Sequence, residues 1–259
     1  MFPVCFRASS LTPGLAIGAN AGCNQGGDFM RFPSRIVALA IQAVVLAGPV
    51  LAAANTPPVA PPAPSPAAAA DDTWTAADVA AMQGRAAVGN ASSMYSLGLA
   101  YETGEGIARD LAKSVMWYQR AAKLGNRDAM NNLGNLYCNG TGVPLDYVQA
   151  LRWFRKAADL GNLIGMYNVG YVYDLGLGVP INDVEAVKWY RKSAEGGYEQ
   201  AMAAMGQMYE DGEGVERDRG AAAYWYGLLV NSDNAELSKR AKAGLARLRA
   251  LPGLKPTET

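Results

Sequence analysis

The sequence predicts an all-α protein built as a solenoid of four 36-residue helix-pair repeats with a capping helix at each end. Three features recur every 36 residues without insertion or deletion: a tryptophan, a glycine–tyrosine pair, and two glycines. The tryptophans are Trp117, Trp153, Trp189 and Trp225, and Gly98/Tyr101 and Gly104/Gly106 recur three more times at the same spacing. Copies in such regular register are typical of stacked repeats, which present an extended surface rather than a catalytic pocket.

One repeat, 125–160, shows how each unit is expected to fold. Apolar or small residues stand at helical spacing within 127–138, so this stretch is expected to form the first helix. Asn139-Gly140-Thr141-Gly142 ends it, since glycine adopts the left-handed terminal conformation freely. Asp146 precedes the second helix, 147–160, and an N-cap of this type contributes about 1 kcal/mol relative to alanine.

A glycine in the middle of the first helix indicates close helix packing. Gly134 would cost about 1 kcal/mol relative to alanine if nothing compensated for it. A partner helix pressed against its backbone would compensate, with Trp153 or a neighbouring aromatic ring filling the space. Each helix pair therefore leaves an apolar face that the next pair covers.

The stretch from Met30 is typical of a secretory signal peptide, assigned here to residues 30–54. Arg31 and Arg35 precede an apolar run, 36–51, and three alanines follow. Cleavage is expected before Asn55 or after Ala52, and a retained membrane anchor is the alternative. Residues 1–29 are interpreted as a mis-assigned upstream extension, and 55–70 as a Pro/Ala-rich linker.

The solenoid itself is assigned to residues 71–251. The boundaries of the repeats are about 89–124, 125–160, 161–196 and 197–230, with a front cap at 76–87, a C-terminal capping helix at 235–251 and a disordered tail at 252–259. Signal removal would leave Cys138 as the one cysteine of the mature chain. A quiet thiol is the simpler interpretation, and a reactive or dimer-forming thiol is the alternative.

Composition limits the chemistry. The chain has no histidine, which excludes Ser-His-Asp and Cys-His nucleophiles and the usual zinc sites. Twenty-three basic and twenty-three acidic residues cancel, so no overall charge favours nucleic acid. We expect no enzyme activity, no cofactor, no metal, no nucleic-acid partner, and no stable membrane span after signal cleavage.

The repeat resembles the Sel-one-like repeat (SLR) family, which is related to tetratricopeptide repeats. The residues that carry the resemblance in the second copy are Ala129-Met130, Leu133-Gly134, Tyr137, Gly140, Gly142-Val143, Asp146, Ala150, Trp153-Phe154 and Lys156-Ala157-Ala158. The fourth copy departs from the pattern at Leu228-Leu229-Val230. The resemblance implies a right-handed superhelix whose first helices line a concave face, and it implies a scaffold function in envelope assembly, exopolysaccharide machinery, host interaction or signalling.

A candidate binding surface lies beside the core-facing positions of the first helices, where the four copies stop resembling one another. We call it the concave stripe; its residues are Tyr95, Leu99, Asn131, Asn135, Ile164, Tyr167, Tyr171, Asp174 and Gln207. Exposed aromatic clusters often mark interaction sites. The alternative is that Tyr167 and Tyr171 are buried against the next helix pair.

Two charged rows accompany the stripe. Glu102, Asp174 and Glu210 stand near the ends of the first helices, as a cation-preferring rim or as a solvated edge. The second helices carry a basic row that we interpret as a solvated convex face: Arg152, Arg155, Lys156, Lys188, Arg191 and Lys192.

The function that these features favour is a monomeric, non-enzymatic adaptor, periplasmic or secreted, that binds a protein or peptide on the concave face. One alternative is an envelope carbohydrate-binding protein with Tyr167 and Tyr171 as a sugar platform. A hydrolase is less favoured, because the folded region has no supported S-x-x-K motif and no facing carboxylate pair. Dimerisation through Cys138 or Leu228-Leu229-Val230 is a further alternative.

Overall fold

The computed structural model describes residues 74–250. The expected upstream extension (1–29), signal peptide (30–54), linker (55–70) and C-terminal tail (252–259) all lie outside the described residues. The described part forms one compact unit.

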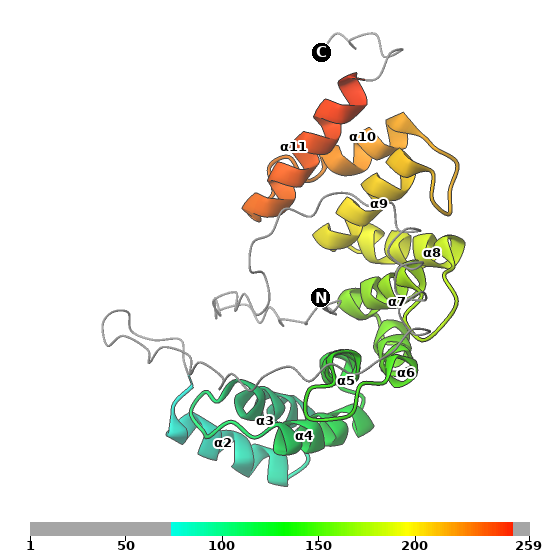
Figure 1. Ribbon diagram of the computed structural model, residues 1–259. Helices are drawn as coiled ribbons and strands as arrows, with labels where there is room; N and C mark the ends of the chain where they lie inside the picture. The colour runs from blue at the N-terminus through cyan, green and yellow to red at the C-terminus, as the bar shows by residue number, and fades with distance from the viewer. Residues whose placement is uncertain (1–73, 251–259) are drawn as a thin grey trace, which may run out of the picture. The chain divides into compact units, whose positions relative to one another are not determined.

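Within residues 74–250 the chain forms ten α-helices and no strand, so the predicted all-α solenoid of helix pairs is confirmed. The helices are α2 (Ala76–Ala87), α3 (Ala91–Thr103), α4 (Leu111–Lys123), α5 (Arg127–Asn139), α6 (Tyr147–Asp159), α7 (Leu163–Leu175), α8 (Asp183–Glu195), α9 (Glu199–Asp211), α10 (Arg219–Gly227) and α11 (Ala235–Ala250). Figure 1 shows the first helices of the repeats (α3, α5, α7, α9) on the inner side of the array and the second helices (α4, α6, α8) on the outer side.

The helix ends follow the repeated capping residues. Asn126 caps α5 by accepting a hydrogen bond from the backbone N–H of Ala129, and Asp146 caps α6 in the same way through Gln149. Each first helix ends at a left-handed glycine; Gly140, for example, has φ 65°. Helices α3 to α9 accordingly all have the same length of 13 residues.

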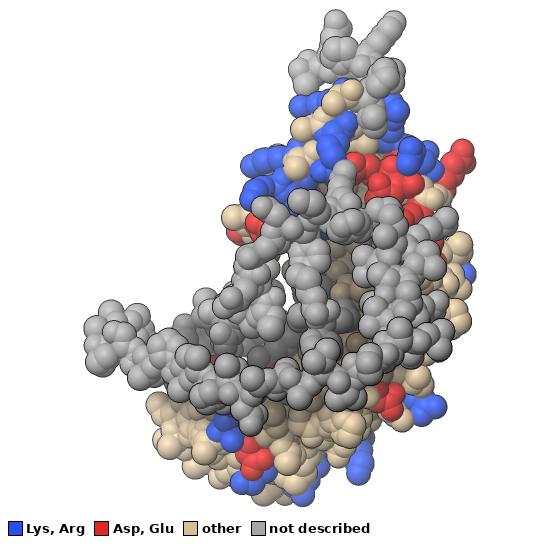
Figure 2. Space-filling view, in the orientation of Figure 1, with Lys and Arg blue, Asp and Glu red and all other residues tan. Residues whose placement is uncertain are grey.

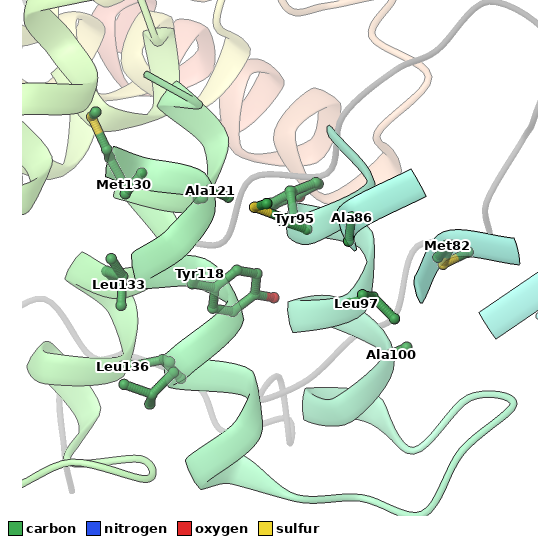
Figure 3. Close-up of a cluster of buried hydrophobic side chains, with 14 of the residues drawn as sticks. Met82, Ala86, Tyr95, Leu97, Ala100, Tyr118, Ala121, Met130, Leu133 and Leu136 are labelled. Carbon is green, nitrogen blue, oxygen red and sulfur yellow. The ribbon is translucent and has the colours of Figure 1, made fainter. Parts of the chain in front are cut away.

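The helix pairs approach closely where the first helix carries its central glycine. A Cβ on Gly134 would collide with the Phe154 ring, and the same holds for Gly98 and Tyr118. The ring that fills the space is therefore the residue after each tryptophan, rather than the tryptophan itself. Figure 3 shows Tyr118 between the helices that carry Leu97 and Leu133, deep in the core.

The tryptophans of the first three repeats are half-buried and stack with cations of their own helix. Arg120 lies 4.8 Å from the ring centre of Trp117, and Lys156 and Lys192 make the matching contacts on Trp153 and Trp189. The basic row on the second helices is thus partly stacked on aromatic rings, a contact that cations favour.

The two ends of the solenoid are covered by α2 and α11. In the last repeat α10 ends early, at Gly227, and Leu229 is completely buried. Leu229 shares a cluster with Leu237, Ala241 and Leu248 of α11. The closing helix therefore covers the central residue of the apolar segment that the sequence offered as a dimer surface.

Cys138 lies in α5 and is 1% exposed. It is disulfide-bonded in the structure of the full chain, whereas the expectation of a single cysteine concerns the chain after signal removal.

Candidate functional site

All nine residues of the concave stripe lie on first helices: two on α3, two on α5, four on α7 and one on α9. Their exposure is uneven. Tyr95, Asn131, Asn135 and Tyr167 are between 0% and 8% exposed, while Leu99, Ile164, Tyr171, Asp174 and Gln207 are half-buried. Part of the stripe therefore belongs to the packing between repeats, and the remainder reaches the surface.

Tyr167 is the centre of an aromatic cluster between the third and fourth repeats. Its ring centre lies 6.3 Å from that of Tyr171, 5.2 Å from Tyr190 and 5.4 Å from Tyr198. Tyr167 is therefore buried against its neighbours, while Tyr171 remains half-exposed at the edge. Burial raises the pKa of Tyr171 to about 12, so its hydroxyl stays protonated at neutral pH.

Tyr198 is part of this cluster, and it stands at the N-cap position of α9, where its side chain does not cap the helix. The first helices α3, α5 and α7 are capped by Asn90, Asn126 and Asn162, whereas Tyr198 makes no side-chain cap hydrogen bond at the start of α9. A missing cap costs about 1 kcal/mol. The aromatic contact with Tyr167 offsets that loss, and sequence reasoning did not identify Tyr198.

Asparagines of α5 form a polar patch beside the aromatic cluster. The side-chain N–H of Asn168 donates to Oδ1 of Asn131 over 2.9 Å, and that of Asn132 donates to the Tyr118 hydroxyl over 3.1 Å. Within residues 74–250, Asn135 has no hydrogen-bond partner on either side-chain atom, and Asn131 Nδ2 and Asn132 Oδ1 also lack one. Buried polar atoms of this kind are uncommon and call for a partner.

The carboxylates at the ends of the first helices accept hydrogen bonds from tyrosines of the second helices. Tyr118 donates to Glu102 over 2.7 Å, Tyr190 to Asp174 over 3.1 Å, and Tyr226 to Glu210 over 2.8 Å. The row is therefore half-buried and hydrogen-bonded, rather than a solvated edge or an open cation rim.

The carboxyl of Asp174 has a raised pKa. Burial raises the pKa of its carboxyl to about 6; the nearby charges of Glu213 and Asp183 act in the same direction, and the Tyr190 hydrogen bond opposes them. Arg247 of α11 contacts Glu210 through two hydrogen bonds of 2.7 Å. That pair fastens the closing helix to the end of the row.

No group of histidine, cysteine or carboxylate side chains within 74–250 is arranged to hold a metal. A search of the same residues for a helix long and apolar enough to cross a membrane also finds none. A shallow depression of about 760 Å³ at the start of α10, lined by Tyr209, Val215 and residues 216–220, shares no residue with the concave stripe.

Comparison with known proteins places these observations in a family. The Sel1 repeat model matches residues 91–126, 127–162, 163–198 and 199–232, which is more than half of the chain. No curated protein matches the chain.

Two solved structures resemble the array. One is c5321, a protective antigen of uropathogenic Escherichia coli with an SLR fold: it is 36% identical with a TM-score of 0.59, over 61% of this chain and 34% of its own. The present chain thus spans about a third of that antigen. The other is a Sel1 repeat protein from Oxalobacter formigenes, 26% identical with a TM-score of 0.58, over 66% of this chain and 79% of its own. With four successive repeats matched, the chain belongs to the Sel1 repeat family, whose members generally act as scaffolds for protein–protein interaction.

Proposed function

We propose that this protein is a non-enzymatic scaffold of the bacterial periplasm or cell envelope that holds a segment of another protein against the concave stripe. The observation that carries the proposal is the amide of Asn135, which lies in the middle of the stripe and finds no partner for its donor or its acceptor in the described part of the chain. A side-chain amide and a peptide bond have matching donor and acceptor groups.

Both side-chain polar atoms of Asn135 are covered, so a bound peptide backbone would pair with them once the neighbouring side chains move aside. Leaving a buried polar group unpaired costs about 1–3 kcal/mol, so a ligand that pairs with the amide of Asn135, which is 7% exposed, gains from removing that penalty. Leu99 and Tyr171 lie on the neighbouring first helices and are half-buried, and they supply apolar contact for the ligand's side chains. Tyrosine is favoured at such contacts.

The test is a crosslinked affinity capture from an envelope fraction. The variant Asn135→Leu/Tyr171→Ala removes the amide and the half-exposed ring, and it leaves the packed Tyr167 in place. The control variant Arg152→Ala/Lys188→Ala removes two exposed cations of the second helices. We expect the same protein to be captured by wild type and control and lost by the stripe variant, with all three equally helical by circular dichroism. Equal capture by the stripe variant would place the binding site elsewhere.

Export through residues 30–54 is the second part of the proposal. It is supported by the basic start, the apolar run and the alanines that precede Asn55. N-terminal sequencing of protein from a periplasmic fraction is expected to begin at Asn55 or Ala53. Protein that retains the apolar run and sediments with membranes would instead support the anchor.

The carbohydrate alternative is less well supported. A sugar platform needs an open aromatic face, and Tyr167 is 8% exposed with three tyrosine rings around it. Only Tyr171 of the proposed pair is half-exposed. A binding screen with envelope glycans that gave a signal lost in Tyr171→Ala would revive this alternative.

A further inference from the structure

The exposed side of the closing helix is strongly basic. Helix α11 carries five cations and one carboxylate, Glu236. Arg247 forms a salt bridge with Glu210, whereas the other four cations are exposed and, within 74–250, form no salt bridge. We call these four residues the basic edge: Lys239, Arg240, Lys242 and Arg249. Figure 2 shows the blue side chains gathered over this helix, although the chain as a whole is neutral.

The basic edge is held by a firmly packed helix. Leu237, Ala241 and Leu248 are buried on the opposite side of α11. Gly244 lets the helix approach Tyr226 so closely that an added Cβ would lie 2.5 Å from the ring. The Arg247–Glu210 pair adds a polar fastening. The backbone positions of the four cations are therefore fixed, so binding does not have to order the helix that carries them.

The basic edge also lies next to the concave stripe. Helix α11 follows α10 in the position of a further first helix, and it packs against α9. The charge of Arg240 reaches Tyr167 on α7, where it favours ionisation of the phenol against the larger effect of burial, which raises that pKa. An occupant of the stripe that extends past Gln207 on α9 would meet the basic edge.

We propose that the basic edge of α11 binds an acidic segment of the protein held in the concave stripe. This inference rests on the proposed scaffold function and adds the charge of its partner. Oppositely charged patches speed encounter and select among partners more than they add affinity, so binding should weaken as salt rises.

Two other anionic partners fit the surface less well. The residues interspersed with the cations on the exposed side are alanines, such as Ala243 and Ala246, which offer no bulky apolar group to enter a bilayer. The chain has equal numbers of acidic and basic residues, so it lacks the overall positive charge that is typical of a nucleic-acid-binding protein.

The test uses the mature full-length protein and a fluorescent peptide of glutamates and alanines, followed by anisotropy at low and high salt. The variant Lys239→Glu/Arg240→Glu/Lys242→Glu reverses three charges of the basic edge. The control Lys123→Glu/Arg152→Glu/Lys188→Glu makes the same change in net charge on the second helices. We expect about a tenfold weaker affinity in the α11 variant and little change in the control.

A second α11 variant, with glutamine at the same three positions, keeps the test valid if charge reversal unfolds the helix; it should weaken binding by a smaller factor. Equal weakening in the control would mean that net charge alone is sensed, and it would overturn the proposal. Binding of wild type to phosphatidylglycerol vesicles but not to the peptide would also overturn it. If the peptide fails to bind while Asn135→Leu/Tyr171→Ala still loses its captured protein, the basic edge is not a binding site and the scaffold function stands.

Discussion

The phenol of Tyr190 donates a 3.1 Å hydrogen bond to Oδ2 of Asp174, 16 residues earlier in the same repeat. The first and fourth repeats keep the pair as Tyr118–Glu102 and Tyr226–Glu210. In the second repeat both partners are replaced: Phe154 stands at the tyrosine position and has no hydroxyl, and Cys138 stands at the carboxylate position. The pair thus behaves as a unit that links the second helix to the end of the first.

The first prediction concerns Asp174→Asn, which keeps an acceptor for Tyr190 but removes the charge. The folded-state pKa of about 6 exceeds the ordinary 3.8, so the stabilisation from proton binding is present below about pH 4 and is lost as the pH rises through 6. The free energy of unfolding of the variant should therefore be about 1–2 kcal/mol higher than that of wild type at pH 7.5, and the two should be similar at pH 4. Urea unfolding at both pH values measures this. Asp159→Asn, at an exposed position, is the control, and a pH-independent difference would argue against the burial of Asp174.

The second prediction concerns the fastening of α11. Arg247→Met should destabilise the closing helix by about 1–3 kcal/mol, because it leaves the carboxylate of Glu210, 9% exposed, without its charged partner. Hydrogen exchange across 235–250 should speed up before the rest of the chain is affected. Lys242→Met changes an exposed cation of the same helix and should leave exchange as in wild type. Unchanged exchange in Arg247→Met would mean that apolar packing alone holds the helix.

The third prediction compares the effects of two glycine-to-alanine changes on the free energy of unfolding. Gly134→Ala places a methyl group in the Phe154 ring and should cost about 1–3 kcal/mol through overpacking. Gly84 is also inside a helix, but nothing lies within 4 Å of the added Cβ, so Gly84→Ala should stabilise by about 0.5–1 kcal/mol. Thermal unfolding separates the two. Shifts of the same sign would show that the glycines are not packing contacts.

The repeated positions made the helices predictable. The second helix expected over 147–160 is α6, Tyr147–Asp159, and the closing helix expected over 235–251 is α11, Ala235–Ala250. Caps and glycines act locally, so residue spacing reveals them. The filler of Gly134 was left open between Trp153 and its neighbour, since helix spacing does not fix which ring turns inward.

The concave stripe was less predictable because burial depends on how neighbouring helix pairs rotate. Tyr167 and Tyr171 stand at equivalent-looking positions, yet only Tyr171 reaches the surface. The contact of Tyr167 with Tyr198 joins two repeats and leaves no trace in the spacing. The tyrosine–carboxylate pairs could have been found in the sequence, because both members of the pair are replaced together in the second repeat, by Phe154 and Cys138.

The central claim, that the concave stripe holds a protein segment, is tested most directly by photocrosslinking in cells. A photoreactive amino acid replaces Tyr171 in one strain and Arg152, exposed on α6, in another. The account predicts a discrete adduct from position 171 that is abolished by Asn135→Leu and absent from position 152, with mass spectrometry locating the crosslink in an acidic segment of the captured protein. Adducts from position 152 alone, or adducts from 171 that persist in Asn135→Leu, would contradict it.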